Sequence, residues 1–169
     1  MAMRWNKRPE MALDPTRTYH ATLKLAHGDV RIQLFAADAP ETVNSFVFLS
    51  RQGYYDGVTF HRVIQGFMAQ GGDPTGTGTG GPGYYVPDEV NQNKHGDEGG
   101  VAMAKTNAPN SAGSQFYITI APTPFLDKDY TVFGRVVSGM DVVKKIRLRD
   151  PDRDRAPGDA ITTIEIEES

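Results

Sequence analysis

The sequence predicts a mainly β domain, built as a barrel or a sandwich, on three observations. Polarity alternates over several short segments, which is the pattern of half-buried strands. Turn formers are frequent, with 18 glycines and 11 prolines among 169 residues. Only two segments have the periodicity of a helix. Many short strands with few helices are typical of both architectures, so periodicity alone does not choose between them.

The first elements are a β-hairpin and a helix. Residues 19–25 and 30–34 alternate in polarity on either side of the turn signal His27-Gly28-Asp29. A helix is expected from about Pro40 to Gly53, because proline and an acid open the segment and glycine ends it. Its apolar face would consist of Val43, Phe46, Val47 and Leu49.

The rest of the chain carries short strands and one more helix. Strands are expected over 59–64, 67–70, 101–104, 115–120 and 131–137. The second helix is expected from Met140 to about Leu148. Its inward-facing residues would be Val142, Val143 and Ile146. Residues 160–167, AITTIEIE, alternate as a last strand, and the two helices would plug the ends of a barrel.

We expect one domain, residues 18–169, after an N-terminal tail of residues 1–17. The tail has mixed charge and no sustained period, and it holds the only tryptophan, Trp5. Disorder is its expected state. The alternative is that it packs along the domain through Trp5, Met11 and Leu13. A third outcome would insert Pro9 into a pocket of a neighbouring molecule.

Composition excludes several classes of function. The net charge of −3 argues against binding to nucleic acid or to an anionic membrane by bulk charge. Cysteine is absent, which excludes disulfides, a thiolate nucleophile and cysteine-bound zinc. No apolar run approaches the roughly 18 residues of a membrane span, and the first residues lack the apolar core of a secretory signal. We therefore expect a cytoplasmic protein.

Familiar catalytic motifs are missing or out of place. Residues 76–81, GTGTGG, formally match a dinucleotide fingerprint, but no helical run follows, so a surface loop is favoured. The four histidines form no zinc-binding pattern. Ser111 and Ser114 lack the surroundings of a nucleophile elbow. The scattered carboxylates do not favour a glycosidase pair, although they leave it open.

The segment 60–73, FHRVIQGFMAQGGD, places an arginine among apolar residues. If 59–64 and 67–70 are adjacent strands, alternation puts Phe60, Arg62 and Ile64 on one face. His61 and Val63 would then lie on the other face. An arginine on an apolar face is costly to bury without a partner. It is either a surface residue in a salt bridge or a guanidinium fixed beside an apolar pocket, which would bind an apolar group carrying a hydrogen-bond acceptor.

Together these motifs resemble the cyclophilin family of peptidyl-prolyl cis–trans isomerases. The similar motifs, in order from about Tyr19 to Ile166, are FHRVIQGFMAQGGD, GTGTGG, AMAKT, PNSAGSQFYIT, PFLD and YTVFGRV. The resemblance implies a closed eight-stranded antiparallel β-barrel capped by two α-helices, with an active groove on its outer surface. It also implies rotation of X–Pro bonds in proline-containing polypeptides, assistance to protein folding, and no metal or cofactor.

The resemblance also assigns a site. Arg62 matches the catalytic arginine, and Gln70 matches the residue that helps hold that arginine and the substrate. Further matches to the substrate groove are Phe67, Met68, Gly78, Ala104, Gln115, Tyr117 and Leu126. Three groove positions differ from the usual pattern: Lys105 replaces asparagine, Phe125 replaces tryptophan and Tyr130 replaces histidine. Because Phe125 lacks an indole N–H, a cyclosporin-type inhibitor is expected to bind weakly.

Two functional classes remain. The first is an isomerase, expected to be a monomer that binds neither nucleic acid nor membrane. The second is a module that binds proline segments with little turnover, against which the intact Arg62 and Gln70 argue. A structural or assembly protein would need an exposed apolar face or extra domains. A protease-coupled isomerisation assay discriminates between the first two.

Overall fold

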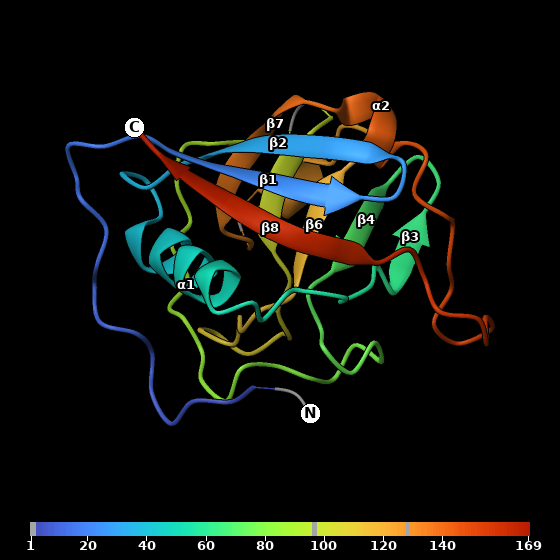
Figure 1. Cartoon of the computed structure of the whole chain (residues 1–169), viewed down its shortest axis with the longest axis horizontal. Coiled ribbons are helices and arrows are strands. Elements are labelled where there is room, and N and C mark those ends of the chain that lie inside the picture. Colours follow the sequence, from blue (N-terminus) through green and yellow to red (C-terminus); the bar gives the residue numbers. More distant parts are fainter. Residues whose placement is uncertain (1–2, 96–97, 128) are drawn as a thin grey trace.

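A computed structural model describes residues 3–95, 98–127 and 129–169, apart from the side chain of Phe125. Eight antiparallel strands form one strongly curled sheet, in the order β3-β4-β6-β5-β7-β2-β1-β8 (Figure 1). The strands are β1 (Tyr19–Leu25), β2 (Gly28–Leu34), β3 (Arg62–Ile64), β4 (Met68–Gly71), β5 (Gly100–Met103), β6 (Phe116–Thr119), β7 (Val132–Ser138) and β8 (Ile161–Glu168). The mainly β architecture with eight strands and two helices is confirmed.

Two isolated bridges lie beside the edge strands of the sheet, β3 and β8. Thr59 bridges to Ala160, directly before β8, and Val63 of β3 bridges to Arg149. Within the described ranges, no continuous ladder joins β3 to β8. The curled sheet is therefore completed by single bridges at this seam, and a barrel closed by paired strands is not formed there.

The first helix, α1 (Pro40–Arg51), packs its apolar face against the core of the curled sheet. Its expected apolar face, Val43, Phe46, Val47 and Leu49, is buried. The ring of Phe46 lies 5.5 Å from that of Phe116 and 5.2 Å from that of Phe133, measured between centroids. The helix thus joins strands β6 and β7 in one aromatic core.

The second helix, α2 (Met140–Val143), is shorter than the sequence predicts. After Val143 the backbone continues in tighter turns, in which the N–H of Ile146 donates to the carbonyl of Val143. The N–H of Arg147 then donates to the Asp159 carboxylate, which ends the helical path. The expected inward-facing residues, Val142, Val143 and Ile146, are nevertheless buried.

The segment before β3 differs from the predicted strand over 59–64. Regular pairing begins only at Arg62, so the alternation does not reach back to Phe60. Phe60 is fully buried in the interior core and does not share the face of Arg62. The other predictions for this segment hold: Arg62 and Ile64 are exposed, and His61 and Val63 are buried.

Strands β4, β5 and β6 are covered on both faces. Their inward side chains, among them Ala69, Phe116 and Ile118, belong to the interior core. A separate apolar cluster lies on the outside and is formed by Met68, Ala102, Tyr117 and Val132. Partly buried Phe35, Phe67, Ala104, Leu126 and Tyr130 pack against it. We call this set the outer cluster. The candidate site described below lies on it.

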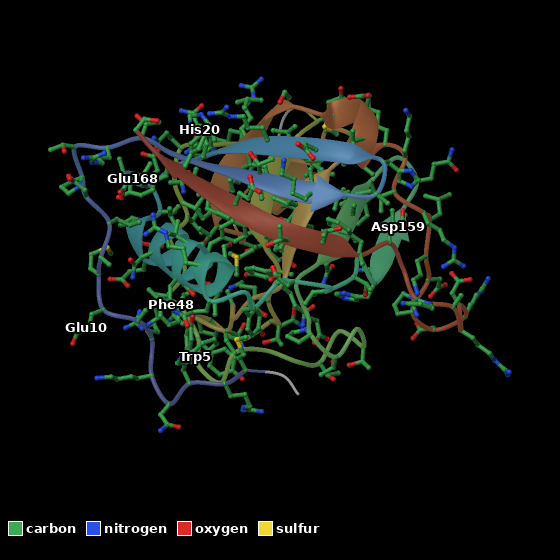
Figure 2. The ribbon with its side chains drawn as sticks, viewed as in Figure 1. Trp5, Glu10, His20, Phe48, Asp159 and Glu168 are labelled. Carbon is green, nitrogen blue, oxygen red and sulfur yellow. The ribbon has the colours of Figure 1, made fainter. Side chains whose placement is uncertain are left out.

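In the structure, residues 3–17 run along the outside of the domain and contact it at several points. The N–H of Trp5 donates to the carbonyl of Pro82 over 2.9 Å. The indole ring lies against Phe48 at 5.2 Å in an edge-to-face arrangement, and 6.0 Å from the ring of Tyr54 (Figure 2). The packed alternative thus applies to Trp5, and Leu13 also contacts the core.

Farther along the tail, α1 holds the chain through one side chain. The Asn44 amide accepts the N–H of Ala12 over 3.0 Å and donates to the carbonyl of Glu10 over 3.1 Å. Met11, between these two contacts, is 49% exposed and is not among the residues that pack against the interior core, unlike Trp5 and Leu13.

We expect Trp5→Ala to lower the free energy of unfolding by about 1 kcal/mol. Burying a large side chain contributes roughly 1.5–3 kcal/mol before the entropy of ordering the chain is subtracted, and Trp5 is only half-buried. The melting temperature should fall by about 2–4 °C at this chain length. Met11→Ala in the same tail is the control and should leave it unchanged. Equal melting temperatures for all three proteins would mean that the tail does not stabilise the domain.

Candidate active site

A small cavity of about 170 Å³ opens on the outer cluster. Its lining residues are Arg62, Phe67, Met68, Gln70, Ala104, Lys105, Tyr117, Leu126 and Tyr130. All nine belong to the site that the sequence assigned. They come from β3, the turn before β4, β4 itself, β6, the residues after β5, and the short helix η1 (Pro124–Leu126) with the turn that follows it.

Strand register places the polar and apolar parts of this cavity in one row. Arg62 of β3 pairs with Gln70 of β4, Gln70 pairs with Tyr117 of β6, and Tyr117 pairs with Ala102 of β5. Directly paired residues on one face have Cβ atoms about 4.5–5.5 Å apart. The row therefore aligns a guanidinium, an amide and an aromatic ring across the sheet.

The apolar floor of the cavity is well fixed. Met68 is 3% exposed and Tyr117 is 4% exposed. The ring of Tyr130 meets the ring of Tyr117 edge to face, at 5.9 Å between centroids. Leu126 is tied to this wall through its carbonyl, which accepts the N–H of Tyr130 over 3.3 Å. Such a pocket suits a small apolar ring.

Arg62 stands at the rim of the floor without a charged partner. Its side chain is exposed, and no described carboxylate forms an ion pair with it. Of the two interpretations of Arg62, a surface arginine in a salt bridge with a described carboxylate is therefore excluded. The guanidinium is free to donate hydrogen bonds to a group bound in the cavity.

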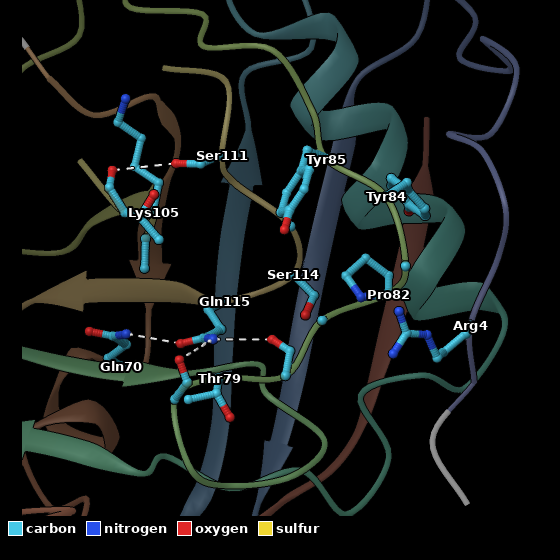
Figure 3. A pocket seen from close by; sticks show the side chains of 17 residues that line it. Arg4, Gln70, Thr79, Pro82, Tyr84, Tyr85, Lys105, Ser111, Ser114 and Gln115 are labelled. Atoms are coloured by element: carbon cyan, nitrogen blue, oxygen red, sulfur yellow. Dashed lines mark hydrogen bonds between the residues drawn. The ribbon is translucent and has the colours of Figure 1, made fainter. Parts of the chain in front are cut away.

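Gln70 bonds to a residue other than the arginine beside it. Its Nε2 atom donates to Oε1 of Gln115 over 3.2 Å. Gln115 in turn donates from Nε2 to the carbonyls of Gly78, over 3.0 Å, and Gly80, over 3.2 Å (Figure 3). In this structure Gln70 therefore links the cavity to the glycine loop, and among the described residues its connection to Arg62 is the pairing of β3 with β4.

The glycine loop is organised by one buried carboxylate. Asp73 is fully buried and accepts the backbone N–H groups of Thr75, Gly78 and Gly80 over 2.8, 2.6 and 3.1 Å. Burial alone would raise the pKa of Asp73, but these hydrogen bonds outweigh burial and hold the pKa below its usual value. Gly78 thus contributes to the site through its backbone, at a position fixed by Asp73.

Sequence reasoning missed a polar chain behind the floor. His95 is fully buried; its Nδ1 atom lies 2.8 Å from Oδ1 of Asp127, and its Nε2 atom lies 2.9 Å from the hydroxyl of Tyr117. A carboxylate only accepts, so Nδ1 carries a proton and donates it to Asp127. From the sequence, His95 was considered only as a possible metal ligand. No local pattern indicates hydrogen-bond partners 22 and 32 residues away.

The hydrogen-bonded residues Asp127, His95 and Tyr117 differ in how burial affects their protonation. Burial raises the pKa of Tyr117 well above its usual value, so the phenol stays neutral. Burial would also raise the pKa of Asp127, but hydrogen bonds from the backbone and ring of His95 outweigh it and lower the pKa. Tyr117 is therefore an oriented, uncharged part of the cavity floor.

Lys105 is less available than its sequence position suggests. Its ammonium donates to Asp88 over 2.9 Å, and its side chain is 12% exposed. Burial would raise the pKa of Asp88, but hydrogen bonds from Asn110 and Lys105 lower it, so the carboxylate is ionised. The pair is neutral overall, and Lys105 lines the cavity mainly with its apolar stem.

Two of the residues that the resemblance assigned to the site lie just beyond the cavity at Arg62. The side chain of a third is not among those that the structure describes. Gly78 and Gln115 line a second cavity of about 550 Å³, which shares Gln70 and Ala104 with the first (Figure 3). The backbone of Phe125 belongs to η1, but its side chain is outside the described part of the structure. The groove is therefore longer than the cavity at Arg62 alone.

Searches for a metal site and for a membrane span gave negative results over the described ranges. No group of three or more His, Asp or Glu side chains could hold a metal ion there. Among the same residues, we found no helix whose length and hydropathy would allow it to cross a membrane.

Comparison with known proteins gives one consistent result. A sequence model described as cyclophilin type peptidyl-prolyl cis-trans isomerase/CLD matches residues 20–168. A peptidyl-prolyl cis-trans isomerase of Synechococcus elongatus is 50% identical over 133 residues, covering 79% of this chain and 90% of the relative. The Schizosaccharomyces pombe isomerase ppi1 is 44% identical over 145 residues, covering 84% of this chain and 94% of the relative.

Solved structures agree with the sequence relatives. A cyclophilin type peptidyl-prolyl cis-trans isomerase of Cryptosporidium parvum superposes with a TM-score of 0.81 at 32% identity, covering 89% of this chain and 98% of the other. The same isomerase, crystallised in the presence of the dipeptide Ala-Pro, gives a TM-score of 0.79 at 34% identity, with coverage of 88% and 98%.

The packing of the glycine loop on Asp73 leads to a prediction for two adjacent glycines. A Cβ atom at Gly80 would run into the Asp73 carboxylate, whereas a Cβ atom at Gly81 would meet nothing within 4 Å. We expect Gly80→Ala to lower the free energy of unfolding by about 1–3 kcal/mol, as overpacking does. Gly81→Ala should have no such effect. Urea denaturation measures both, and equal free energies would contradict the role given to Asp73.

Proposed function

Because this chain belongs to the cyclophilin-type peptidyl-prolyl cis–trans isomerases, we propose that its outer cavity binds proline and that Arg62 assists rotation of the X–Pro bond. The chain is a peptidyl-prolyl cis–trans isomerase, and the proposal concerns how its own residues act. One observation carries it: an unpaired guanidinium stands at the rim of a small, rigid apolar pocket.

The chemistry of the reaction calls for a donor at the proline nitrogen. Amide resonance blocks rotation by about 18–20 kcal/mol, although the two isomers of an X–Pro bond differ little in free energy. Conjugation is lost at the twisted transition state, and the nitrogen regains a lone pair. A donor aimed at that nitrogen stabilises the transition state more than either ground state. Arg62 is placed to be this donor.

The rest of the cavity would hold the ring while the preceding carbonyl swings. Met68 and Tyr117 form the floor, and Phe67 and Leu126 form the walls. A pocket of low polarity also favours the less conjugated transition state. No nucleophile, general base or metal is required, because no covalent bond is made or broken.

A relative supports the choice of ligand. The Cryptosporidium parvum isomerase was crystallised in the presence of Ala-Pro, and its fold matches this chain closely. We propose that proline-containing polypeptides are the substrates here too. The second candidate, a module that binds proline segments with little turnover, would use the same pocket and is separated from the enzyme only by the assay described below.

The remaining parts of the proposal concern the cellular setting. We propose that the protein acts as a monomer. A chain without cysteine fits the reducing cytoplasm, where assistance to protein folding is the proposed role. A cyclosporin-type inhibitor is proposed to bind weakly, since Phe125 offers less contact area than an indole and no N–H donor.

We expect Arg62→Ala to lower kcat/KM for an X–Pro peptide by at least tenfold in a protease-coupled assay. Tenfold corresponds to about 1.4 kcal/mol of transition-state stabilisation, modest for a hydrogen bond from a charged donor. Arg62→Lys should also be poor, because it keeps the charge but loses the planar fork.

The control for this experiment is Arg51→Ala, which removes an arginine at the end of α1, away from the cavity. It should keep wild-type turnover. A folded Arg62→Ala protein with wild-type kcat/KM would refute the proposed role of Arg62. Wild-type protein that binds proline peptides without turnover would favour the binding module.

Turnover of an uncharged peptide should stay flat between about pH 6 and pH 8, because no group touching the proline changes its protonation there.

The stability of the fold, in contrast, should depend on pH in this range. Burial lowers the pKa of His61, whose Nδ1 atom is buried without a partner. The unfolded chain therefore takes up a proton first, and stability is lost as pH falls from about 6.5 toward the folded-state pKa.

Thermal unfolding at each pH measures this loss, and His61→Phe should remove the part of the slope that His61 causes. A bell-shaped profile of kcat/KM with an uncharged peptide would contradict the mechanism. An unchanged slope in His61→Phe would contradict the assignment to His61.

A further inference from the structure

The second cavity along the groove carries one unneutralised charge. It adjoins the proline cavity through Gln70, Ala104 and Lys105, which line both. Its only charged lining residues among those described are Arg4 and Lys105, and no described Asp or Glu lines it. A peptide bound at its proline would extend beside this cavity, since about 3.3 Å of chain is added with each residue.

The charge of Lys105 is already compensated, whereas that of Arg4 is not. Lys105 donates to Asp88 over 2.9 Å. No described carboxylate forms an ion pair with Arg4. Asp73, beneath the glycine loop, is fully buried and uses both carboxylate oxygens to accept N–H groups of that loop. The free positive charge of the cavity is therefore the guanidinium of Arg4.

The tail holds Arg4 in place although the side chain itself is exposed. The next residue, Trp5, bonds to Pro82 through its backbone and packs its ring on Phe48. A Cβ atom added at Gly83 would run into the carbonyl of Trp5, so the tail and the loop run in close contact. Figure 3 shows Arg4 beside Pro82 and on the opposite side of the pocket from Gln70.

We propose that Arg4, supplied by the N-terminal tail, is a specificity residue that favours substrates with an acidic side chain within a few residues of the proline. The cavity is large enough for a side chain, and a carboxylate entering it would meet the guanidinium across from the proline site. Arginine forms two parallel hydrogen bonds with a carboxylate, which adds direction to the attraction. This inference rests on the proposed isomerase function and deepens it.

The test is a set of peptides that differ in one side chain. A reference peptide with one proline and glutamine at its other variable positions is compared with peptides carrying glutamate at each of three positions before and three after the proline. We expect wild type to show a kcat/KM about threefold higher for glutamate than for glutamine at one or more positions at low salt, the scale of a partly exposed ion pair. The preference should shrink at about 0.5 M salt.

Arg4→Gln should abolish this preference, so that the glutamate peptides and the reference peptide are turned over with the same kcat/KM. The matched control is Arg8→Gln, which removes a tail arginine that pairs with Glu41 at 3.9 Å and does not line the cavity. It should keep the preference. Because Arg4 is exposed and Trp5 is untouched, Arg4→Gln should melt at the wild-type temperature.

The proposal is overturned if wild type shows no glutamate preference at any position, or if the preference survives in Arg4→Gln. Failure of the proposed function looks different: wild type would then not turn over the reference peptide. In that case, the difference in Kd between glutamate and glutamine peptides, measured by fluorescence anisotropy, still decides whether Arg4 recognises an acidic side chain.

Discussion

The site depends on the register of strands that are covered on both faces. In β6, Phe116 and Ile118 point into the interior core while Tyr117 points outward, and β4 divides Ala69 from Met68 in the same way. A slip of one residue would exchange these faces and bury polar groups in the core. The interior core therefore fixes which side chains reach the outside, and the row from Arg62 to Ala102 follows from pairing across four strands.

Two hydrogen-bonded networks support this row from either side. On one side, Asp73 shapes the glycine loop, whose carbonyls orient Gln115, which then accepts from Gln70. On the other side, Asp127 orients His95, whose Nε2 atom forms a hydrogen bond with the Tyr117 hydroxyl. Rigid donors and walls that are set before a substrate arrives need no reorganisation during the reaction. Arg62 is the exposed member of this row, and pairing of β3 with β4 fixes its backbone.

The sequence pattern predicted those elements whose structure depends on neighbouring residues in the chain. The alternation in 19–25 and 160–167 gave β1 and β8 nearly to the residue, and the apolar face of α1 was read from its spacing. Phe60 was misplaced because period-two reasoning assumes regular strand where the backbone is irregular. The partners of His95 and Gln70 were out of reach, since contacts over 22 to 45 residues depend on the folded sheet. The resemblance supplied the lining residues but could not supply Arg4, which lies outside the motifs that carry it.

The packed tail also determines what intrinsic fluorescence can report. Trp5 is the only tryptophan of the chain, and its ring rests on Phe48 and Tyr54 at the surface of the domain. All tryptophan emission therefore comes from the junction of tail and loop, and none from the barrel interior or the proline cavity. A change in that emission signals release of the tail, which can precede unfolding of the sheet. Far-ultraviolet circular dichroism follows the strands, so the two optical signals separate detachment of the tail from loss of the fold.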